Sequence, residues 1–274
     1  MNKIRYFVAI CVAKLAVIAL KVFGYKGTDF PGIVAFKICP VFLRYVKKPK
    51  VIIGVTGTNG KTTATNLVSD MLSTLGTEVI PNRDGSNTHT GIATALIKAS
   101  GIFGKCKYSL GVFEMDERSM RFIGTQMDID KLVVCNLSRD SIMRTGHPEF
   151  VRNVLTRFIS DKTELICNAD DYNAYSVSPN NKRTYFGIKK MEGDRLDCNN
   201  IINDVPICPV CGEKIKFKYY RYSNIGKIYC DACGYTSPEY DYYLDEMDFK
   251  KNEMLFVARG ESQRVAILND SVFN

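Results

Sequence analysis

The stretch VIIGVTGTNGKTT, residues 51–63, is the part of the sequence best suited to phosphate chemistry. A short apolar run is followed by a glycine-rich turn, and the backbone N–H groups of such a turn can face a polyphosphate. Lys61 would supply a cation for the outer phosphates, and the hydroxyl of Thr62 is placed to hold Mg²⁺. We therefore predict a site for ATP and Mg²⁺ that is formed by Gly57, Thr58, Asn59, Gly60, Lys61, Thr62 and Thr63.

The spacing of this loop departs from the usual G-x-x-x-x-G-K-[ST] pattern. That pattern requires glycine at position 55, where this chain has Val55, while Gly54 lies one position early and Gly57 is an additional glycine. The alternative interpretation is a plain turn between a strand and a helix. Such a turn would not require the sequence GTNGKTT, so nucleotide binding is favoured.

Four cysteines form a second candidate site. CPVCG at 208–212 and CDACG at 230–234 are two CxxCG turns, with 18 residues between Cys211 and Cys230. Each turn can present two thiolates to one ion, and two turns make a closed tetrahedral site, which is typical of structural zinc. Iron is the alternative metal, because four thiolates also suit iron. The predicted ligands are Cys208, Cys211, Cys230 and Cys233.

Short apolar runs alternate with helix-like segments around these residues. Such alternation predicts an α/β fold with a mainly parallel sheet and helices on both faces. We expect strands at 51–55, 108–113, 132–135, 164–167, 253–258 and 264–268, and helices at 61–75, 91–100 and 148–160. On the first of these helices, Leu67, Met71, Leu72 and Leu75 share one face.

The segment from Cys198 to about Tyr243 interrupts this rhythm, because it is rich in Tyr, Lys, Gly and Cys and has no helical periodicity. We predict four parts of the chain. They are an amino-terminal apolar helix and linker at 1–48, an ATP-binding domain at 49–203, an inserted zinc ribbon at 204–243, and strands that complete the ATP-binding domain at 244–274.

The composition is that of a globular protein. The 274 residues are 46% hydrophobic and 24% charged, which argues against disorder, collagen and coiled coil. The net charge of +8 favours anionic partners, but the charges are interspersed and give no support for nucleic-acid binding. The six cysteines outside the CxxC turns lie mostly in apolar contexts, which indicates a reducing, cytoplasmic location.

The amino-terminal segment MNKIRYFVAICVAKLAVIALKVFG has three interpretations. Lys14 interrupts the apolar run and no small-x-small cleavage site follows, which argues against a secretory signal. As a helix, the segment has a broad apolar face and a narrow stripe of Lys3, Lys14 and Lys21. A helix packed on the body of the protein is the favoured interpretation, and a helix resting on the anionic inner leaflet is the alternative.

The loop GVTGTNGKTT resembles the ATP loop of the Mur ligase family. Members of that family phosphorylate a carboxylate with ATP and let an amine displace the phosphate. The resemblance implies that an acidic residue after a later strand binds Mg²⁺. Here the apolar run YSLGVF precedes Glu114, which we predict as that ligand, with Asp116 and Glu117 as rivals. NADD at 168–171 also resembles a family segment, without an assigned role.

The Cys₄ insertion resembles the MurT branch of the family, the ligase-like subunit of lipid II isoglutaminyl synthase. The segments DGSNTHTGIATALI, EMDER and NLSRD support the same resemblance. It implies an ATP-dependent ligase of peptidoglycan synthesis that amidates the D-glutamate α-carboxylate of lipid II. It also implies a GatD-like glutamine amidotransferase partner that delivers ammonia. Glutamate attachment to folate is a weaker alternative, since the Cys₄ insertion gives it no support.

The resemblance places the proposed catalytic Asp in a carboxy-terminal domain that would follow Asn274, so no catalytic residue is assigned in this chain. In NLSRDSIMRTG the family usually has His or Gln followed by an acid, where this chain has Ser141 and Met143, although Arg139, Asp140 and Arg144 are retained. The chain is then either a piece of a longer ligase or a shortened ATP-binding scaffold or regulatory homologue without turnover.

Overall fold

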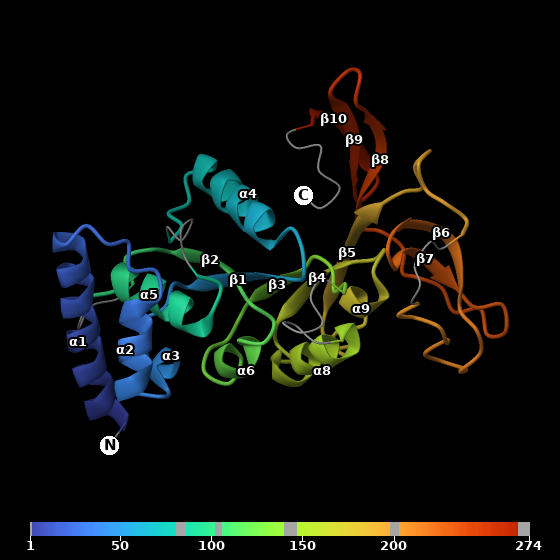
Figure 1. Cartoon of the computed structure of the whole chain (residues 1–274). Coiled ribbons are helices and arrows are strands. Elements are labelled where there is room, and N and C mark those ends of the chain that lie inside the picture. Colours follow the sequence, from blue (N-terminus) through green and yellow to red (C-terminus); the bar gives the residue numbers. More distant parts are fainter. Residues whose placement is uncertain (1, 81–85, 102–105, 140–146, 198–202, 268–274) are drawn as a thin grey trace. The chain divides into compact units, whose positions relative to one another are not determined.

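The computed structural model of the chain describes residues 2–80, 86–101, 106–139, 147–197 and 203–267 (Figure 1). The chain forms two compact units. The first comprises Met1–Thr56, Lys61–Val133 and Val154–Thr163, and the second comprises Gly57–Gly60, Val134–Asn153 and Glu164–Asn274. Among the described residues, none of the helices has the length and hydrophobicity that a membrane-spanning segment needs.

Parallel pairing brings the end of β1 (Val51–Thr56) and the predicted magnesium ligand Glu114 to one edge of the sheet in the first unit. β1 pairs with β2 (Leu110–Glu114) so that Val55 lies opposite Glu114. The strand order here is β3-β1-β2, and β3 (Lys131–Val134) runs on into the second unit. Buried Ile52, Val55 and Val112 explain why these segments are nearly continuous apolar runs.

Three helices of the first unit pack side by side, as Figure 1 shows. They are α1 (Asn2–Val22), α2 (Phe30–Ile38) and α5 (His89–Ala99). Thr88 caps α5 by accepting a hydrogen bond from the backbone N–H of Gly91 at 3.1 Å. This unit also contains the short helices α3 (Phe42–Tyr45) and α6 (Met120–Ile123) and the longer α4 (Lys61–Thr74).

The predicted helix after the phosphate loop is present as α4, but its apolar residues are not a buried face. Leu67, Met71 and Leu75 are 39%, 66% and 80% exposed, and the helix buries only Thr65. The spacing of the apolar residues therefore predicted the helix correctly, but it did not predict which side of the helix is buried.

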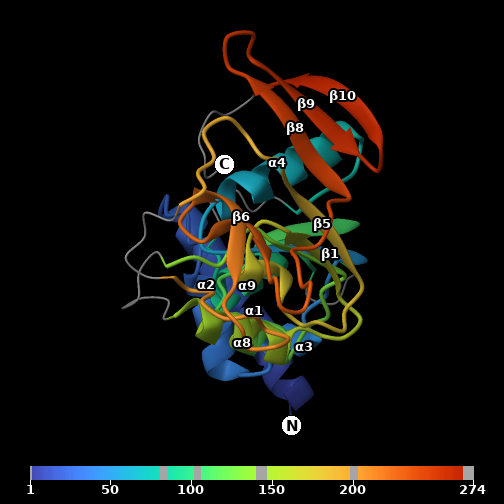
Figure 2. The same cartoon turned by 90° about the vertical axis from the view of Figure 1, so that its right-hand side faces the viewer.

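The second unit continues the parallel pattern and then reverses it. β4 (Glu164–Asn168), β5 (Arg183–Ile188) and β8 (Tyr242–Asp248) pair in parallel, and β9 (Glu253–Ala258) and β10 (Glu261–Ala266) add antiparallel strands (Figure 2). The order is β10-β9-β8-β5-β4.

α8 (Pro148–Phe158) begins in this unit, and α9 (Tyr172–Tyr175) follows β4. We did not predict β5 or β8, because both are largely half-buried and show no clear period-two alternation.

The cysteine-rich insertion contains its own antiparallel pair, β6 (Lys216–Tyr222) and β7 (Ile225–Tyr229). A buried network around Asp170, the third residue of NADD, attaches the insertion to the rest of the second unit. One carboxylate oxygen accepts hydrogen bonds from Arg221 at 3.1 Å and from the backbone N–H of Ile188 at 2.9 Å, and the other accepts from the Tyr240 hydroxyl. Arg221 also pairs with Asp194 at 2.8 Å. NADD thus links the end of β4 to the insertion.

Because Asp170 and Asp194 are almost fully buried, replacing Arg221 with methionine should cost about 3–5 kcal/mol of folding free energy. The measurement is urea denaturation followed by circular dichroism. As a control, Arg264→Met removes an exposed pair with Glu246 and should cost less than about 1 kcal/mol. Equal costs for the two variants would show that the Asp170 network does not hold the insertion.

Candidate functional site

The loop between β1 and α4 has the conformation that its glycines allow. Gly57 and Gly60 have φ values of 134° and 79°, which favour glycine. A Cβ atom on Gly57 would lie 2.8 Å from the backbone oxygen of Asn136, so no larger residue fits without movement. The backbone N–H groups of Thr58 and Asn59 donate to the backbone oxygen and side-chain oxygen of Asn136, at 2.7 and 3.1 Å. The loop is therefore held in shape by a residue that follows β3.

The segment that supports the loop is itself held by the NADD sequence. The carboxylate of Asp171 accepts a hydrogen bond from the backbone N–H of Leu137 at 2.5 Å, and Asn168 donates to the backbone oxygen of Cys135 at 2.9 Å. Burial raises the pKa of Asp171 to about 7, although backbone donors lower it in part. Asn168 and Asp171 thus bind the backbone of Cys135 and Leu137, the two neighbours of Asn136 in the sequence. NADD therefore has a structural role beside the loop.

Thr62 and Glu114 lie together at the start of α4. The Thr62 hydroxyl donates to Oε2 of Glu114 at 2.7 Å, and Nδ2 of Asn87 donates to Oε1 of the same carboxylate at 2.9 Å. Neighbouring ligands of an octahedral Mg²⁺ at 2.0–2.1 Å would be about 2.9 Å apart. The hydroxyl and carboxylate oxygens therefore have the chemistry and the separation that a shared Mg²⁺ requires.

The three acidic residues that competed as magnesium ligands have different surroundings. Glu117 is buried and pairs with Lys61, with 3.2 Å between Oε1 and Nζ. Burial raises the pKa of Glu117, and the charge of Lys61 lowers it in part. Asp116 accepts hydrogen bonds from the backbone N–H groups of Arg118 and Ser119 and so shapes the turn. Glu114, in contrast, accepts the hydrogen bond from the Thr62 hydroxyl.

The structure places all seven predicted phosphate-binding residues in this loop and the first turn of α4. The structure also shows two residues that we did not predict: Asn87, which contacts Glu114, and Asn136, which contacts the loop. Both lie in segments quoted above, DGSNTHTG and NLSRD. The departures at Ser141 and Met143, and the retained Asp140 and Arg144, lie outside the described residues. Arg139 is described, and its guanidinium pairs with the buried Asp204 and contacts His147.

Replacing Glu114 with glutamine should raise the Mg²⁺ concentration needed for ATP binding by about 10–100-fold, because an amide is a weaker magnesium ligand than a carboxylate. The measurement is a Mg²⁺ titration with a fluorescent ATP analogue. The matched control is Asp116→Asn, which keeps an acceptor for the turn and should leave the requirement unchanged. If Glu117→Gln raised the requirement and Glu114→Gln did not, the assignment of Glu114 would be wrong.

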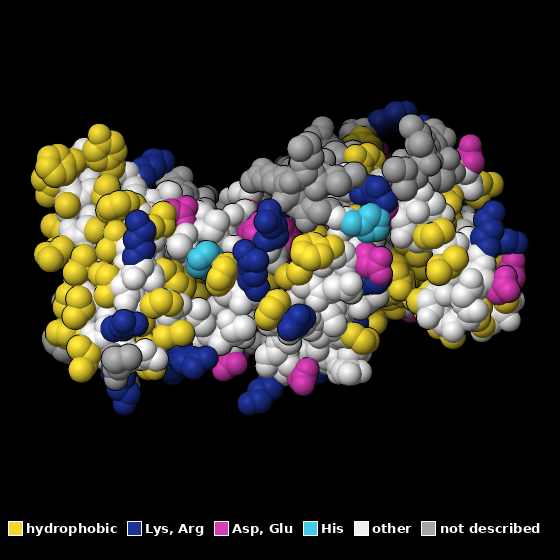
Figure 3. Space-filling model, turned by 60° about the horizontal axis from the view of Figure 1, so that its bottom comes forward, with side chains coloured by type: hydrophobic (Ala, Val, Ile, Leu, Met, Phe, Trp, Pro, Cys, Tyr) yellow, Lys and Arg dark blue, Asp and Glu magenta, His cyan; other side chains and the backbone are white. Residues whose placement is uncertain are grey.

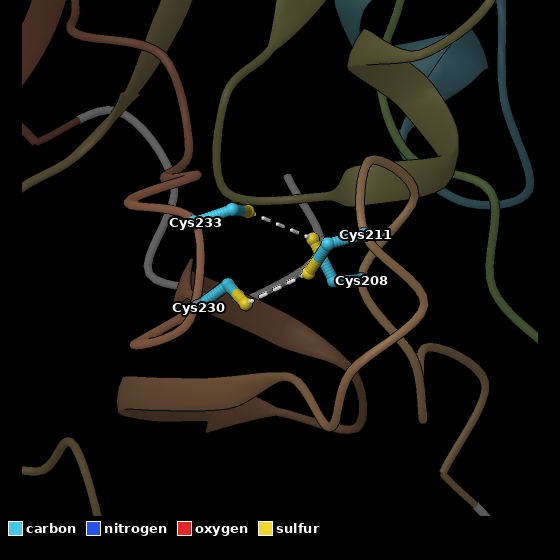
Figure 4. Close-up of side chains that lie close together, drawn as sticks. All are labelled: Cys208, Cys211, Cys230 and Cys233. Atoms are coloured by element: carbon cyan, nitrogen blue, oxygen red, sulfur yellow. Dashed lines mark hydrogen bonds between the residues drawn. The ribbon is translucent and has the colours of Figure 1, made fainter.

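The four cysteines of the two CxxC turns converge, as Figure 4 shows. Their sulfur atoms all lie within 4.8 Å of one another, with 3.6 Å between Cys208 and Cys233 and 3.5 Å between Cys211 and Cys230. None of the cysteines that the structure describes forms a disulfide. In a tetrahedral zinc site with Zn–S bonds near 2.3 Å, sulfur atoms are about 3.8 Å apart, so the four thiols fit one ion.

The two turns are built alike. In each, a glycine with φ near 75° follows the second cysteine and donates its N–H to the first cysteine's backbone oxygen at 3.0 Å; these are Gly212 and Gly234. Burial raises the pKa of Cys208, but the backbone N–H groups of Cys211 and Val210 outweigh it and lower the value to about 7. At Cys208 backbone donors therefore favour the thiolate form, which is the form that binds metal. At Cys211 a backbone donor lowers the pKa, but burial and the neighbouring thiols outweigh it and raise the pKa to about 12.

The sequence has recognised relatives. The MurT subunit of lipid II isoglutaminyl synthase (glutamine-hydrolyzing) from Staphylococcus aureus strain COL is 31% identical over 89% of this chain and 55% of its own length. The corresponding MurT subunit from Streptococcus pneumoniae strain R6 is 30% identical over 88% of this chain and 54% of its own length. The chain therefore spans about half the length of the curated relatives it matches.

Solved structures show the same fold. A pseudomurein peptide ligase type C from Methanothermus fervidus superposes with a TM-score of 0.64 at 23% identity, over 84% of this chain and 44% of the other. The Mur ligase middle domain family matches residues 55–205, which include the phosphate loop, Glu114 and the NADD segment. This match covers more than half of the sequence, and together with the MurT relatives it shows that the chain belongs to the Mur ligase family.

Proposed function

We propose that this chain is the ATP-binding part of an ATP-dependent carbon–nitrogen ligase subunit of peptidoglycan synthesis. The observation that carries the proposal is the arrangement of Lys61, Thr62 and Glu114 in the first unit, directly after a glycine-rich turn in the sequence whose Gly57 and Gly60 have positive φ. Membership of the Mur ligase family supports the same function.

The proposed substrate is lipid II, and the proposed product carries an amide at the D-glutamate α-carboxylate. The names of the relatives support this choice, because they describe a subunit of a glutamine-hydrolysing lipid II isoglutaminyl synthase. A GatD-like glutamine amidotransferase would release ammonia from glutamine and deliver it to the ligase. We propose a cytoplasmic location for this reaction and a structural Zn²⁺ in the Cys₄ insertion at 204–243.

In the proposed reaction the γ-phosphoryl group of ATP moves to a carboxylate oxygen and ADP leaves. Ammonia then attacks the acyl carbon, and phosphate departs with the C–O bond electrons as the amide forms. Lys61 would move from Glu117 to the outer phosphates and offset their charge, while Thr62 and Glu114 would hold Mg²⁺. Mg²⁺ would supply charge neutralisation at the phosphates.

The test is glutamine-dependent amidation of lipid II with ATP hydrolysis by the protein mixed with its cognate glutamine amidotransferase. Lys61→Ala serves as the inactive control. Amidation that requires ATP, glutamine and Lys61 supports the proposal. Mg²⁺-dependent ATP binding without amidation would instead favour the scaffold or regulatory interpretation, and absence of ATP binding would overturn both.

A further inference from the structure

Helix α1 has two apolar sides, and only one of them is buried. Ala9, Ile10 and Ala13 are fully buried in the first unit, where α1 packs on α2 and α5. At about 100° per residue, the exposed apolar residues of α1 fall within an arc of about 140° on the opposite side. This exposed apolar face consists of Ile4, Phe7, Val8, Val12, Leu15, Ile18 and Val22.

The exposed apolar face runs the full length of the helix. Ile4 is 72% exposed near one end, Leu15 is 65% exposed in the middle, and Val22 is 76% exposed at the other end. Phe23 and Tyr25 extend it beyond the helix. Figure 3 shows hydrophobic side chains gathered over this helix, with lysine and arginine side chains beside them. A continuous exposed apolar surface of this kind marks an interaction site.

Basic residues border this face and acidic residues are absent from the segment. Residues 2–28 contain no Asp or Glu. Lys3 and Lys21 fall along one border of the face and Arg5 along the other, and all three are exposed. The segment therefore combines an apolar centre with cationic edges, which is the pattern of a helix that lies in a membrane interface.

Lys14 lies at nearly the same angle on α1 as Lys3 and Lys21, but its amino group is engaged within the first unit. Its Nζ atom donates to the backbone oxygens of Ile97, at 2.9 Å, and Ser100, where α5 ends. A cation at the carboxy-terminal end of a helix offsets the partial negative charge there. Lys14 thus fixes the rotation of α1 on the first unit, and the broad apolar face is left outward.

We propose that the exposed apolar face of α1 binds the surface of an anionic lipid bilayer, with the helix axis parallel to the membrane plane. The 21 residues of α1 give it a length of about 30 Å. A second copy of the same face would bring lysine and arginine borders against each other, which is unfavourable, whereas anionic headgroups complement them. The proposal stands independently of the proposed ligase reaction.

The test is co-sedimentation of the full chain with two kinds of vesicle, phosphatidylcholine alone and phosphatidylcholine mixed with phosphatidylglycerol. We expect binding to the anionic vesicles, at least about tenfold stronger than to the neutral ones. The double variant Leu15→Glu with Ile18→Glu should lower that binding at least about tenfold, because carboxylates replace the centre of the apolar face. Lys3→Gln with Lys21→Gln should weaken binding to anionic vesicles only.

The matched control is Met71→Glu with Leu75→Glu on α4, whose side chains are similarly exposed but lack basic borders. This control should bind vesicles like the unchanged protein. Circular dichroism establishes that each variant keeps its helices, since the replaced side chains are exposed. Failure to bind anionic vesicles, or equal binding by the Leu15/Ile18 variant, would overturn the proposal. The proposal would also be wrong if the protein did not bind vesicles but formed a dimer in sedimentation analysis, and if the Leu15/Ile18 variant were a monomer.

Discussion

Replacing Lys61 with alanine should lower ATP-dependent amidation about 10²–10³-fold or more, which is the largest effect we expect at the phosphate loop. Lys61 is the first residue of α4 and directly follows the loop glycines. Its Nζ atom lies 3.2 Å from Oε1 of Glu117. The transferring phosphoryl group needs a cation at this position to offset its charge. The measurement is amide formation on lipid II together with the binding of a fluorescent ATP analogue.

Two further variants separate this loss from a loss of folding. Lys182→Ala removes an exposed lysine that pairs with Glu164, and it should leave both activities unchanged. Lys61→Ala also removes a cation that faces the buried Glu117, so it should destabilise the protein. Adding Glu117→Gln should restore much of the stability without restoring turnover. Turnover near the original level in Lys61→Ala would contradict the assignment of Lys61.

The local parts of the site follow from the sequence, because adjacent residues determine them. An apolar run, a turn with required glycines and a helical period lie within residues 51–75, so β1, the loop and α4 were predictable. Asn136 and Asn87 were not. Asn136 lies 77 positions from Asn59, and Asn87 lies 27 positions from Glu114, so only the tertiary fold brings these pairs together.

The amino-terminal helix shows a different limit. The sequence predicts a helix that packs on the body of the protein, and α1 does so. A helix with apolar residues on both sides does not indicate which side is buried, because the choice depends on the surface that receives it. The small side chains of Ala9 and Ala13 and the contact from Lys14 to the end of α5 decide the outcome. The Lys14 contact joins residues 83 positions apart, and α2, on which α1 also packs, lies about 20 positions along the chain, so neither can be read from α1 alone.

We expect one zinc ion per chain by elemental analysis, and Cys230→Ser should abolish it. The four sulfur atoms lie within 4.8 Å of one another, and a serine hydroxyl is a poor replacement for a thiolate on zinc. Cys106→Ser is the matched control, because Cys106 lies outside the cluster and should leave the zinc content unchanged. Full zinc in Cys230→Ser, or visible absorption from iron in the purified protein, would contradict a Cys₄ zinc site.

Removing zinc should also unfold the insertion. A two-stranded pair such as β6–β7 is marginally stable alone, and structural zinc contributes apparent binding energies of about 10–16 kcal/mol to small modules. The chain has no Trp, so its intrinsic fluorescence comes from its 15 tyrosines, which include Tyr219 and Tyr240 in contact with each other beside Asp170. A strong chelator should change this signal and increase proteolysis between β5 and β8. The Arg221–Asp170 network would then still attach the insertion, together with the Arg139–Asp204 and Tyr175–Tyr235 contacts, so Arg221→Met should lower the chelator concentration required.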